Sequence, residues 1–207
     1  MLQNNFVSSL TGTVVEEPKE IYIPDKCQSL TIATARKSGY NDLVEIIIPC
    51  ESRMTTTQVK IGDYVRVIGF IYTYENTRNE YPRVKLGLYA TDMVKVSYNT
   101  NKNVIICQGT IVRTPVLRKT PAGLSVCDIL LAVNNDINGV CASYVPVIAW
   151  NTRAELLSSC PVKTQLCVVG RLQSREYTKQ IDGETKTFIT KELSVNSFRI
   201  LGEKDER

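Results

Sequence analysis

The chain carries the same order of sequence features twice, and this internal repeat restricts its fold more than any other property. Each half opens with an apolar segment that contains Gly-Thr, at 10–15 and 107–112, and in each a proline follows six residues after the glycine. Each half later holds an apolar segment with a central glycine, at 65–71 and 166–172. The polar, turn-prone segment 99–103 separates the halves. The sequence therefore predicts two tandem copies of one fold.

Each copy is expected to consist of five short strands. The predicted segments are rich in Val, Ile and Thr and are bounded by Gly, Pro and Asn, which is typical of β-structure with tight turns. Glycine inside a strand indicates a bulge or a sharp bend, as a small closed barrel needs. The predicted strands are 10–15, 29–33, 43–49, 65–71 and 93–96 in the first half, and 107–112, 127–133, 144–150, 166–172 and 195–200 in the second.

One helix is predicted, at 152–159, between the third and fourth strands of the second half. Asn151 or Thr152 can cap its start, and Pro161 prevents its continuation. The matching segment of the first half, 51–57, holds β-branched residues in place of good helix formers, so any helix there is expected to be short or absent.

Together these elements predict an all-β protein made of two tandem five-stranded Greek-key barrels of the oligonucleotide-binding type (OB-fold), with one short helix in the second. The expected lobes are 1–98 and 103–202, followed by a charged tail at 203–207. One continuous sandwich of ten strands is the structural alternative.

The residue inventory favours binding over catalysis. The chain has no histidine, the commonest general acid–base, and none of the usual nucleophile, phosphate-loop or dinucleotide motifs. Its seven cysteines contain no Cys-x-x-Cys pair and several lie in apolar runs, which indicates small buried side chains in a reducing, cytoplasmic compartment. We expect no enzyme activity, no cofactor and no metal. No apolar run is long enough for a membrane helix, and no secretory signal is recognisable at the start.

The positive charge of the chain is confined to one half. The net charge is +4, and residues 1–98 contribute nothing to it because they hold 11 basic and 11 acidic residues. Residues 99–207 hold 14 basic and 10 acidic residues, so the second half is the one expected to meet phosphate groups more readily.

The second half resembles the bacterial single-stranded-DNA-binding protein family over nearly its full length. The run Gly-Arg-Leu-Gln-Ser-Arg-Glu-Tyr at 170–177 matches a Gly-Arg-Leu-x-x-Arg-x-Tyr/Trp pattern, and a turn at 182–183 and a Thr-rich segment at 187–193 follow it. The opening segment at 109–123, which starts in a glycine-containing strand, and the apolar segment 146–151 also fall in the family order. The resemblance implies sequence-independent binding of single-stranded DNA in replication, repair or recombination. The first half resembles the family only in outline.

The expected binding face of the second half combines cations with aromatic rings. Alternation in 170–177 places Arg171 and Tyr177 on one face while Leu172 points into the barrel. Guanidinium groups pair with phosphates, and aromatic rings stack on any base. The resemblance implies stacking at Tyr144, Trp150 and Tyr177; the alternatives are a core role for Trp150 and plain solvent exposure for the arginines. The predicted DNA-binding residues here are Arg113, Arg118, Lys119, Tyr144, Trp150, Arg171, Gln173, Arg175, Tyr177, Lys179 and Lys186.

In the first half, Phe70, Tyr72 and Tyr74 occupy the positions of Arg171, Gln173 and Arg175. Alternation predicts that the three rings share one outward face. Either single-stranded DNA stacks on them or a partner subunit packs against them. Since this half is neutral, a scaffold role with weaker DNA contact is credible.

The assembly and partners follow from the resemblance. Family members carry a disordered linker with an acidic tip that recruits other proteins, and the segment 201–207 shows no such tip. This argues against a hub role and suggests an accessory, plasmid, phage or specialised member, or one whose replication or repair partners dock elsewhere. Two barrels per chain suggest a homodimer that presents four. The alternative function is an accessory or protein-interaction module of a primosome-type machine, and a nuclease is the least favoured.

Overall fold

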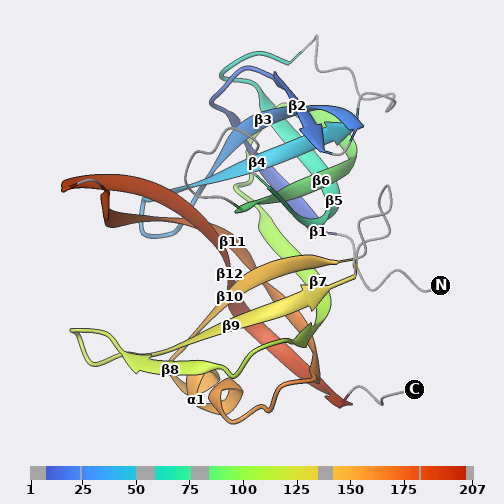
Figure 1. Cartoon of the computed structure of the whole chain (residues 1–207). Coiled ribbons are helices and arrows are strands. Elements are labelled where there is room, and N and C mark those ends of the chain that lie inside the picture. Colours follow the sequence, from blue (N-terminus) through green and yellow to red (C-terminus); the bar gives the residue numbers. More distant parts are fainter. Residues whose placement is uncertain are drawn as a thin grey trace.

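The computed structural model describes residues 8–23, 25–49, 59–75, 84–134, 142–181 and 183–203. Within this part of the chain, six strands form the first lobe and six strands with one helix form the second (Figure 1). The first lobe contains β1 (Ser8–Val14), β2 (Lys19–Ile23), β3 (Asp25–Ala35), β4 (Asn41–Pro49), β5 (Tyr64–Glu75) and β6 (Val84–Lys95). The second contains β7 (Asn103–Ile111), β8 (Val116–Lys119), β9 (Ser125–Val133), β10 (Ser143–Trp150), α1 (Thr152–Ser158), β11 (Thr164–Ile181) and β12 (Glu184–Glu203).

Each lobe closes on itself as a barrel. β1 pairs with both β5 and β3, and β7 pairs with both β11 and β9, so the ends of each sheet meet. Neighbouring strands are antiparallel except for the parallel pairs β4–β6 and β10–β12. The predicted pair of OB-fold barrels is confirmed, and the single sandwich is wrong because the sheet is closed separately in each half.

The structure adds one strand to the five predicted in each lobe. The extra strands, β2 and β8, are short arms that pair with only one neighbour, β3 and β9 respectively. Every residue of β8 is exposed, so this strand has no alternation between a buried and a solvent face. Without that alternation, the sequence offers no periodicity from which a strand can be predicted.

The central glycines mark bulges, as predicted. The register between β5 and β6 shifts at Ile68/Gly69, and the register between β11 and β12 shifts at Val169/Gly170. A β-carbon added at Gly69 or Gly170 would lie 2.1 or 2.2 Å from a carbonyl oxygen of the adjacent strand. Only glycine fits at either position, and the two bulges bend the strands so that each barrel can close.

The helix α1 lies between β10 and β11, as predicted, and buries Ala154 and Leu157 in the barrel core. Asn151 occupies its N-cap with a positive φ of 53° and makes no side-chain capping bond. The corresponding segment of the first lobe, 51–57, lies outside the described residues.

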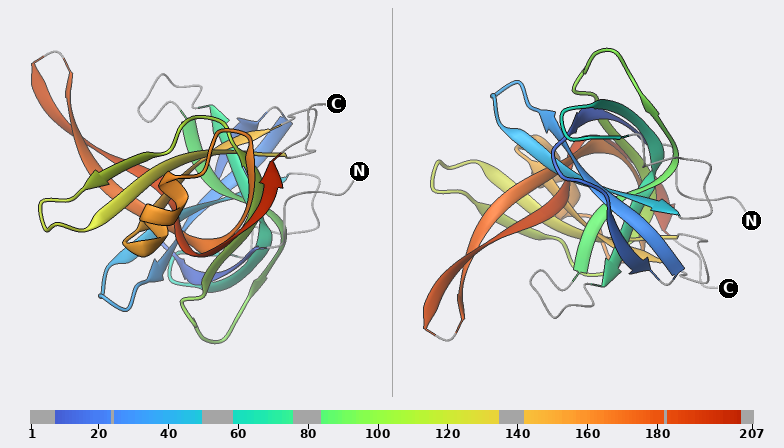
Figure 2. Two further views of the ribbon diagram at one scale, coloured as in Figure 1. Left: turned by 90° about the horizontal axis from the view of Figure 1, so that it is seen from below. Right: turned by 90° about the horizontal axis from the view of Figure 1, so that it is seen from above.

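The two lobes are joined through their first strands. β1 and β7 pair antiparallel at Ser9–Val104 and Leu10–Asn103, and one hydrophobic core cluster includes buried residues of both lobes. In Figure 1 the first lobe lies above the second, and the β11–β12 hairpin projects beyond the barrels, as both views in Figure 2 also show.

The contacts between the lobes follow an approximate twofold symmetry. The strand registers show that Asp42 in the first barrel is the structural equivalent of Ser143 in the second. In the same way, Thr73 is the equivalent of Ser174. The backbone amide of Thr73 donates to the Ser143 hydroxyl at 2.9 Å, and the amide of Ser174 donates to the Asp42 carboxylate at 3.1 Å. The amides that follow Ser143 and Asp42 return equivalent bonds to Thr73 and Ser174, each of 3.1 Å. Two related polar seams therefore hold the lobes together.

Candidate nucleic-acid interface

The sheet of the second lobe presents one continuous surface that we call the outer face. Side chains of directly paired residues lie on the same side of a sheet, so Arg118 and Trp150, which both pair with Val126, share this face. The parallel contact of β10 with β12 extends it to Gln173 and Tyr177 on β11. The polar and aromatic members of the outer face that concern DNA binding are Arg118, Tyr144, Trp150, Gln173, Arg175, Tyr177, Lys186 and Phe188.

The projecting hairpin carries a pair of aromatic rings. Ile181 pairs with Glu184 across a two-residue turn in which Gly183 has a φ of 81°, so Tyr177 lies opposite Phe188. Their ring centroids are 5.6 Å apart with an interplanar angle of 32°. Phe188 was not predicted as a site residue, although counting the register back from the predicted turn would have identified it.

The lysines of this hairpin lie near its tip. Lys186 is half-exposed, with its ammonium nitrogen 3.7 Å from a Glu184 carboxylate oxygen. Lys179 pairs with Lys186 in the backbone register, while its side chain falls outside the described part of the structure. The register therefore places both backbone positions on the projecting hairpin, and contact of these lysines with DNA stays a prediction.

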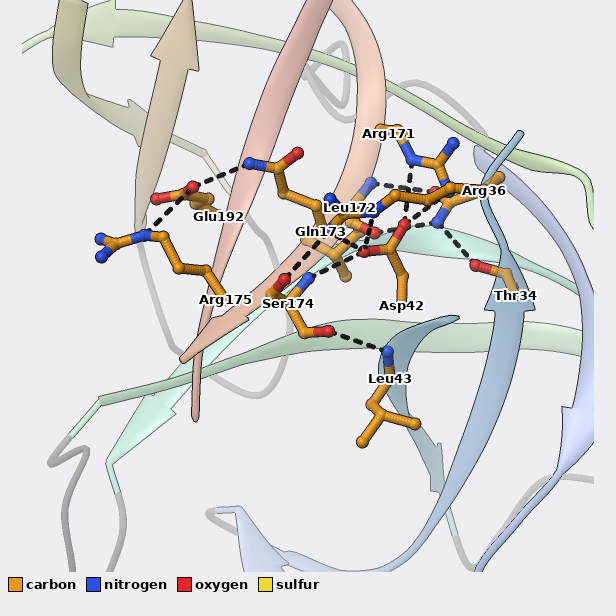
Figure 3. A network of polar contacts seen from close by, with 11 residues as sticks. Thr34, Arg36, Asp42, Leu43, Arg171, Leu172, Gln173, Ser174, Arg175 and Glu192 are labelled. Carbon is orange, nitrogen blue, oxygen red and sulfur yellow. Dashed lines mark hydrogen bonds and ion pairs between the residues drawn. The ribbon is translucent and has the colours of Figure 1, made fainter. Parts of the chain in front are cut away.

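A buried glutamate positions Arg175 and Gln173. The Gln173 amide nitrogen donates to a Glu192 carboxylate oxygen at 2.8 Å, and Arg175 Nε lies 3.5 Å from the same atom (Figure 3). Glu192 is almost fully buried, whereas the Arg175 side chain is 49% exposed. One edge of the guanidinium is therefore anchored, and the rest remains accessible to a phosphate.

Arg171 is engaged elsewhere. Its Nε donates to Asp42 Oδ2 at 3.0 Å, and the Nε of Arg36 donates to Asp42 Oδ1 at 2.9 Å (Figure 3). The Asp42 side chain is completely buried, and Arg36 also donates to the backbone carbonyl of Ser174 at 2.9 Å. Arg171 thus holds the lobes together, and we leave it out of the proposed interface. Its partner lies 129 residues away in the first lobe, which sequence alternation does not reveal.

Asn103 extends this contact on the same seam. Its side-chain amide donates to the Thr34 hydroxyl at 3.0 Å and to the Leu172 carbonyl at 2.8 Å, while its oxygen accepts from the Leu172 amide at 2.9 Å. Asn103 itself is buried, so all of these bonds are shielded from water. We call Arg36, Asp42, Asn103, Arg171 and Ser174 the lobe clamp.

The basic residues of the β8 arm are partly held by acidic neighbours. Arg118 forms an ion pair with Asp128 at 2.7 Å. Lys119 donates to the Ser125 hydroxyl at 2.8 Å, which in turn donates to Glu155 at the same distance. Arg113 is exposed in the preceding loop. This arm therefore offers positive charge beside the Trp150 end of the outer face.

The three predicted stacking aromatics all lie on the outer face. Tyr144 is 55% exposed, and Trp150 and Tyr177 are partly exposed. Trp150 is not a member of the core cluster. Its position is thus compatible with stacking and does not support the alternative core role.

The first lobe differs from this arrangement. Phe70, Tyr72 and Tyr74 share one face as predicted, but Tyr72 is only 1% exposed and packs with Ile23 and Cys27 in a second, small cluster. The prediction of three outward rings is therefore wrong for Tyr72, because the β2 arm, which the sequence did not predict, contributes to a cluster over it. Phe70 stacks on Tyr89 with ring centroids 5.2 Å apart. The described chain itself covers part of the face that was assigned to DNA or a partner.

Cysteines play no visible part in the site. Cys27, Cys107, Cys127 and Cys160 are buried, and none of these four forms a disulfide. Burial raises the pKa of Cys107 to about 12 and that of Cys127 to about 11, so both stay protonated at neutral pH.

No group of three or more potential metal ligands occurs among the described residues. In the same part of the chain, no helix has the length and apolar character needed to cross a membrane.

Comparison with known proteins relates this geometry to one family. The sequence profile of the single-strand binding protein family matches residues 101–201. Single-stranded DNA-binding protein 1 of Streptococcus pyogenes is 31% identical over 108 residues, which cover 50% of this chain and 81% of the relative. Single-stranded DNA-binding protein A of Bacillus subtilis is 32% identical over 108 residues, but the match spans only 61% of its length. These sequence matches cover about half of this chain.

A solved structure matches both lobes. The wild-type single-stranded DNA binding protein from Thermus aquaticus superposes with a TM-score of 0.71 at 20% identity, covering 97% of this chain and 95% of the other. At this identity the likeness establishes the fold, and it extends the OB-fold architecture to the first lobe. The family profile on residues 101–201 and the Streptococcus relative, which is 31% identical over 81% of its length, lead to one conclusion: the chain belongs to the single-strand binding protein family, whose members bind DNA and are not enzymes.

Proposed function

We propose that this protein binds single-stranded DNA without reading its sequence, in replication, repair or recombination, and that the outer face of the second lobe is its main contact surface. The observation that carries this proposal is the shared face of Tyr144, Trp150 and the Tyr177–Phe188 pair, with Arg118, Arg175 and Lys186 beside them. Family membership supports the ligand, and the register of the strands supports the location.

The chemistry of the outer face suits a flexible strand with unstacked bases. Each base stacked on an aromatic ring contributes roughly 1–3 kcal/mol, whatever its identity, since every base has a π-face. The half-exposed guanidinium of Arg175 is held by Glu192 on one edge and offers its other donors to a phosphate. Strong contacts that ignore base identity are what a general single-strand binder requires.

The lobes are proposed to share the work unequally. The first lobe is neutral over residues 1–98, and its central ring, Tyr72, is buried. We assign it mainly to assembly, with weaker DNA contact.

The proposed assembly is a cytoplasmic homodimer that presents four barrels. Light scattering tests it, because a mass of one 23.2 kDa chain at working concentration would contradict a dimer. Replication or repair proteins are the partners expected.

A fluorescence titration tests the proposed function. Trp150 is the chain's single tryptophan, so its emission reports directly on the outer face. Oligo-dT of graded length should change this emission, and log K should fall with log salt by about 0.7 per phosphate neutralised. Tyr177→Ala and Arg175→Ala should each weaken binding by about tenfold, a change of roughly 1.4 kcal/mol.

The matched controls lie on the opposite side of the same hairpin. Glu176 and Thr178 alternate with Arg175 and Tyr177, so alanine at either position should leave affinity within about twofold, less than roughly 0.5 kcal/mol. Unchanged Trp150 emission together with no binding at low salt would refute the proposed function. Equal losses from both sides of the hairpin would refute the proposed face.

A further inference from the structure

A cavity of about 720 Å³ lies between the two lobes. Its lining includes structurally equivalent residues of the two barrels. Leu43 on β4 is the equivalent of Tyr144 on β10, and Glu45 is the equivalent of Pro146. The cavity therefore lies where equivalent strands of the two lobes meet, and the first lobe supplies the larger part of its lining. Because the paired residues differ, its two walls have different chemistry.

One wall of the cavity continues the outer face. Tyr144, Pro146 and Leu130 line the cavity, and the registers of β9 and β10 place all three on the same side of the sheet as Trp150. The exposed ring of Tyr144 thus stands where the outer face meets the cavity. The bond from the Tyr144 backbone amide to the Thr73 hydroxyl, at 3.1 Å, holds the backbone at this position against the first lobe. Single-stranded DNA bound along the outer face toward Tyr144 would therefore reach the cavity.

The other wall is polar, with Glu45 and Tyr74 from the first lobe and Lys191 from the second. The Glu45 carboxylate lies 3.6 Å from the ammonium of Lys191, and both side chains are mostly buried. The Tyr74 hydroxyl is buried close to the Glu45 carboxylate, and it makes no hydrogen bond of full geometry with any described residue. Burial, together with the neighbouring Glu45 charge, raises the pKa of Tyr74. A buried hydroxyl without a full hydrogen bond costs stability unless a ligand satisfies it.

The charges of the lining favour a base over a phosphate. Four glutamates and three lysines line the cavity. Two of these lysines are already paired with lining carboxylates, Lys191 with Glu45 and Lys19 with Glu16. A phosphate would meet an excess of acceptors and negative charge. An exocyclic amino group, which only donates, would meet the acceptors it needs.

We propose that the cavity is a nucleobase pocket that prefers a base with an exocyclic amino group, such as cytosine, with Tyr144 as the stacking platform at its entrance and Glu45 as the discriminating acceptor. This inference rests on the proposed function and deepens it. The outer face binds any sequence, whereas this pocket adds a preference in base composition. Carboxylates accept from the amino group of cytosine but have no donor for the carbonyl that uracil and thymine carry at the same ring position.

The test compares oligo-dC with oligo-dU, which differ at that ring position without the thymine methyl group. The oligomers should be about 30 nucleotides long, enough for two barrels at roughly 16 nucleotides each. Titrated at neutral pH through Trp150 emission, the wild-type protein should bind oligo-dC at least about fivefold more tightly. Glu45→Gln should bring the two affinities within about twofold, because an amide serves either base equally well.

Two further variants keep the test interpretable. If Glu45→Gln alone fails to fold because Lys191 is left unpaired, the double variant Glu45→Gln with Lys191→Met removes the ion pair as a unit. Glu176→Gln, on the opposite side of the hairpin, should retain the wild-type ratio. Equal affinities in the wild type, or a ratio that Glu45→Gln leaves unchanged, would overturn the pocket while the proposed function stands. Failure of both oligomers to bind would instead overturn the proposed function.

Discussion

Replacing Asp42 by asparagine tests how the two lobes are held in register. The Asp42 carboxylate is fully buried and accepts bonds from both Arg36 and Arg171 and from the Ser174 amide. Asparagine keeps the shape, but it removes the negative charge and turns one acceptor into a donor that faces a guanidinium. The backbone and the surrounding apolar packing are left unchanged, so the measured effect belongs to the lobe clamp.

The expected loss is large because two cations lose their common partner. Removing one member of a buried ion pair typically destabilises a protein by about 3–5 kcal/mol. The arginine side chains here are 29% and 25% exposed, so water compensates them in part. We therefore expect the lower end, about 3 kcal/mol, which for a chain of this size corresponds to a fall in Tm of roughly 6–12 °C.

Urea unfolding followed by circular dichroism and Trp150 emission measures this loss. The two probes should also separate in Asp42→Asn, since Trp150 reports only the second lobe while circular dichroism reports both. The control is Glu20→Gln, which breaks the exposed Lys26–Glu20 pair and should cost under about 0.5 kcal/mol. A loss below about 1 kcal/mol in Asp42→Asn, with coincident transitions, would refute the view that this carboxylate couples the lobes.

Three more predictions concern the barrel and the interface. Gly170→Ala should destabilise the protein by about 3 kcal/mol or prevent folding, since its β-carbon would lie 2.2 Å from the Ser194 carbonyl oxygen; a wild-type urea midpoint would contradict this. The raised pKa values of Cys107 and Cys127 add stability that is complete below pH 9 and is lost as the pH rises toward 11 and 12, and alanine at both positions should flatten that loss. Phe188→Ala should weaken oligo-dT binding by about fivefold, a change of roughly 1 kcal/mol, while Phe188→Tyr should not.

The architecture was largely predictable because local sequence signals, such as glycines and turn residues, mark the same strand boundaries and bulges that the long-range strand pairing requires. Gly69 and Gly170 recur at equivalent bulges, and the turn at 182–183 fixes the longest hairpin. The helix α1 also follows from local signals, its start near Asn151 and the stop at Pro161. The arm β8 escaped prediction because it has no buried side, and a strand without alternation has no pattern to detect. The arm β2 was missed as well; it is short, and its buried residue Ile23 stands at its end.

The positions of the site residues were predictable where alternation within one strand or the family resemblance determined them. Alternation correctly placed Arg175 and Tyr177 together on the outer face. It also placed Arg171 there, but it carries no information about a second lobe that meets the same strand and pairs that arginine with Asp42. Tyr72 was misjudged for a related reason, since its cover comes from Ile23 on an arm that pairs with only one neighbour.

The pairing of β1 with β7 has a consequence for how the protein responds to dilution. When two separate chains share such a symmetric contact, the contact is lost as their concentration falls. Here the same covalent chain supplies both strands, so they stay at a high effective concentration, of roughly millimolar order. The arrangement of the two barrels, and with it the cavity between them, is therefore the same at nanomolar as at micromolar protein. A cell can keep very few copies of such a protein and still have every copy ready with both lobes in place.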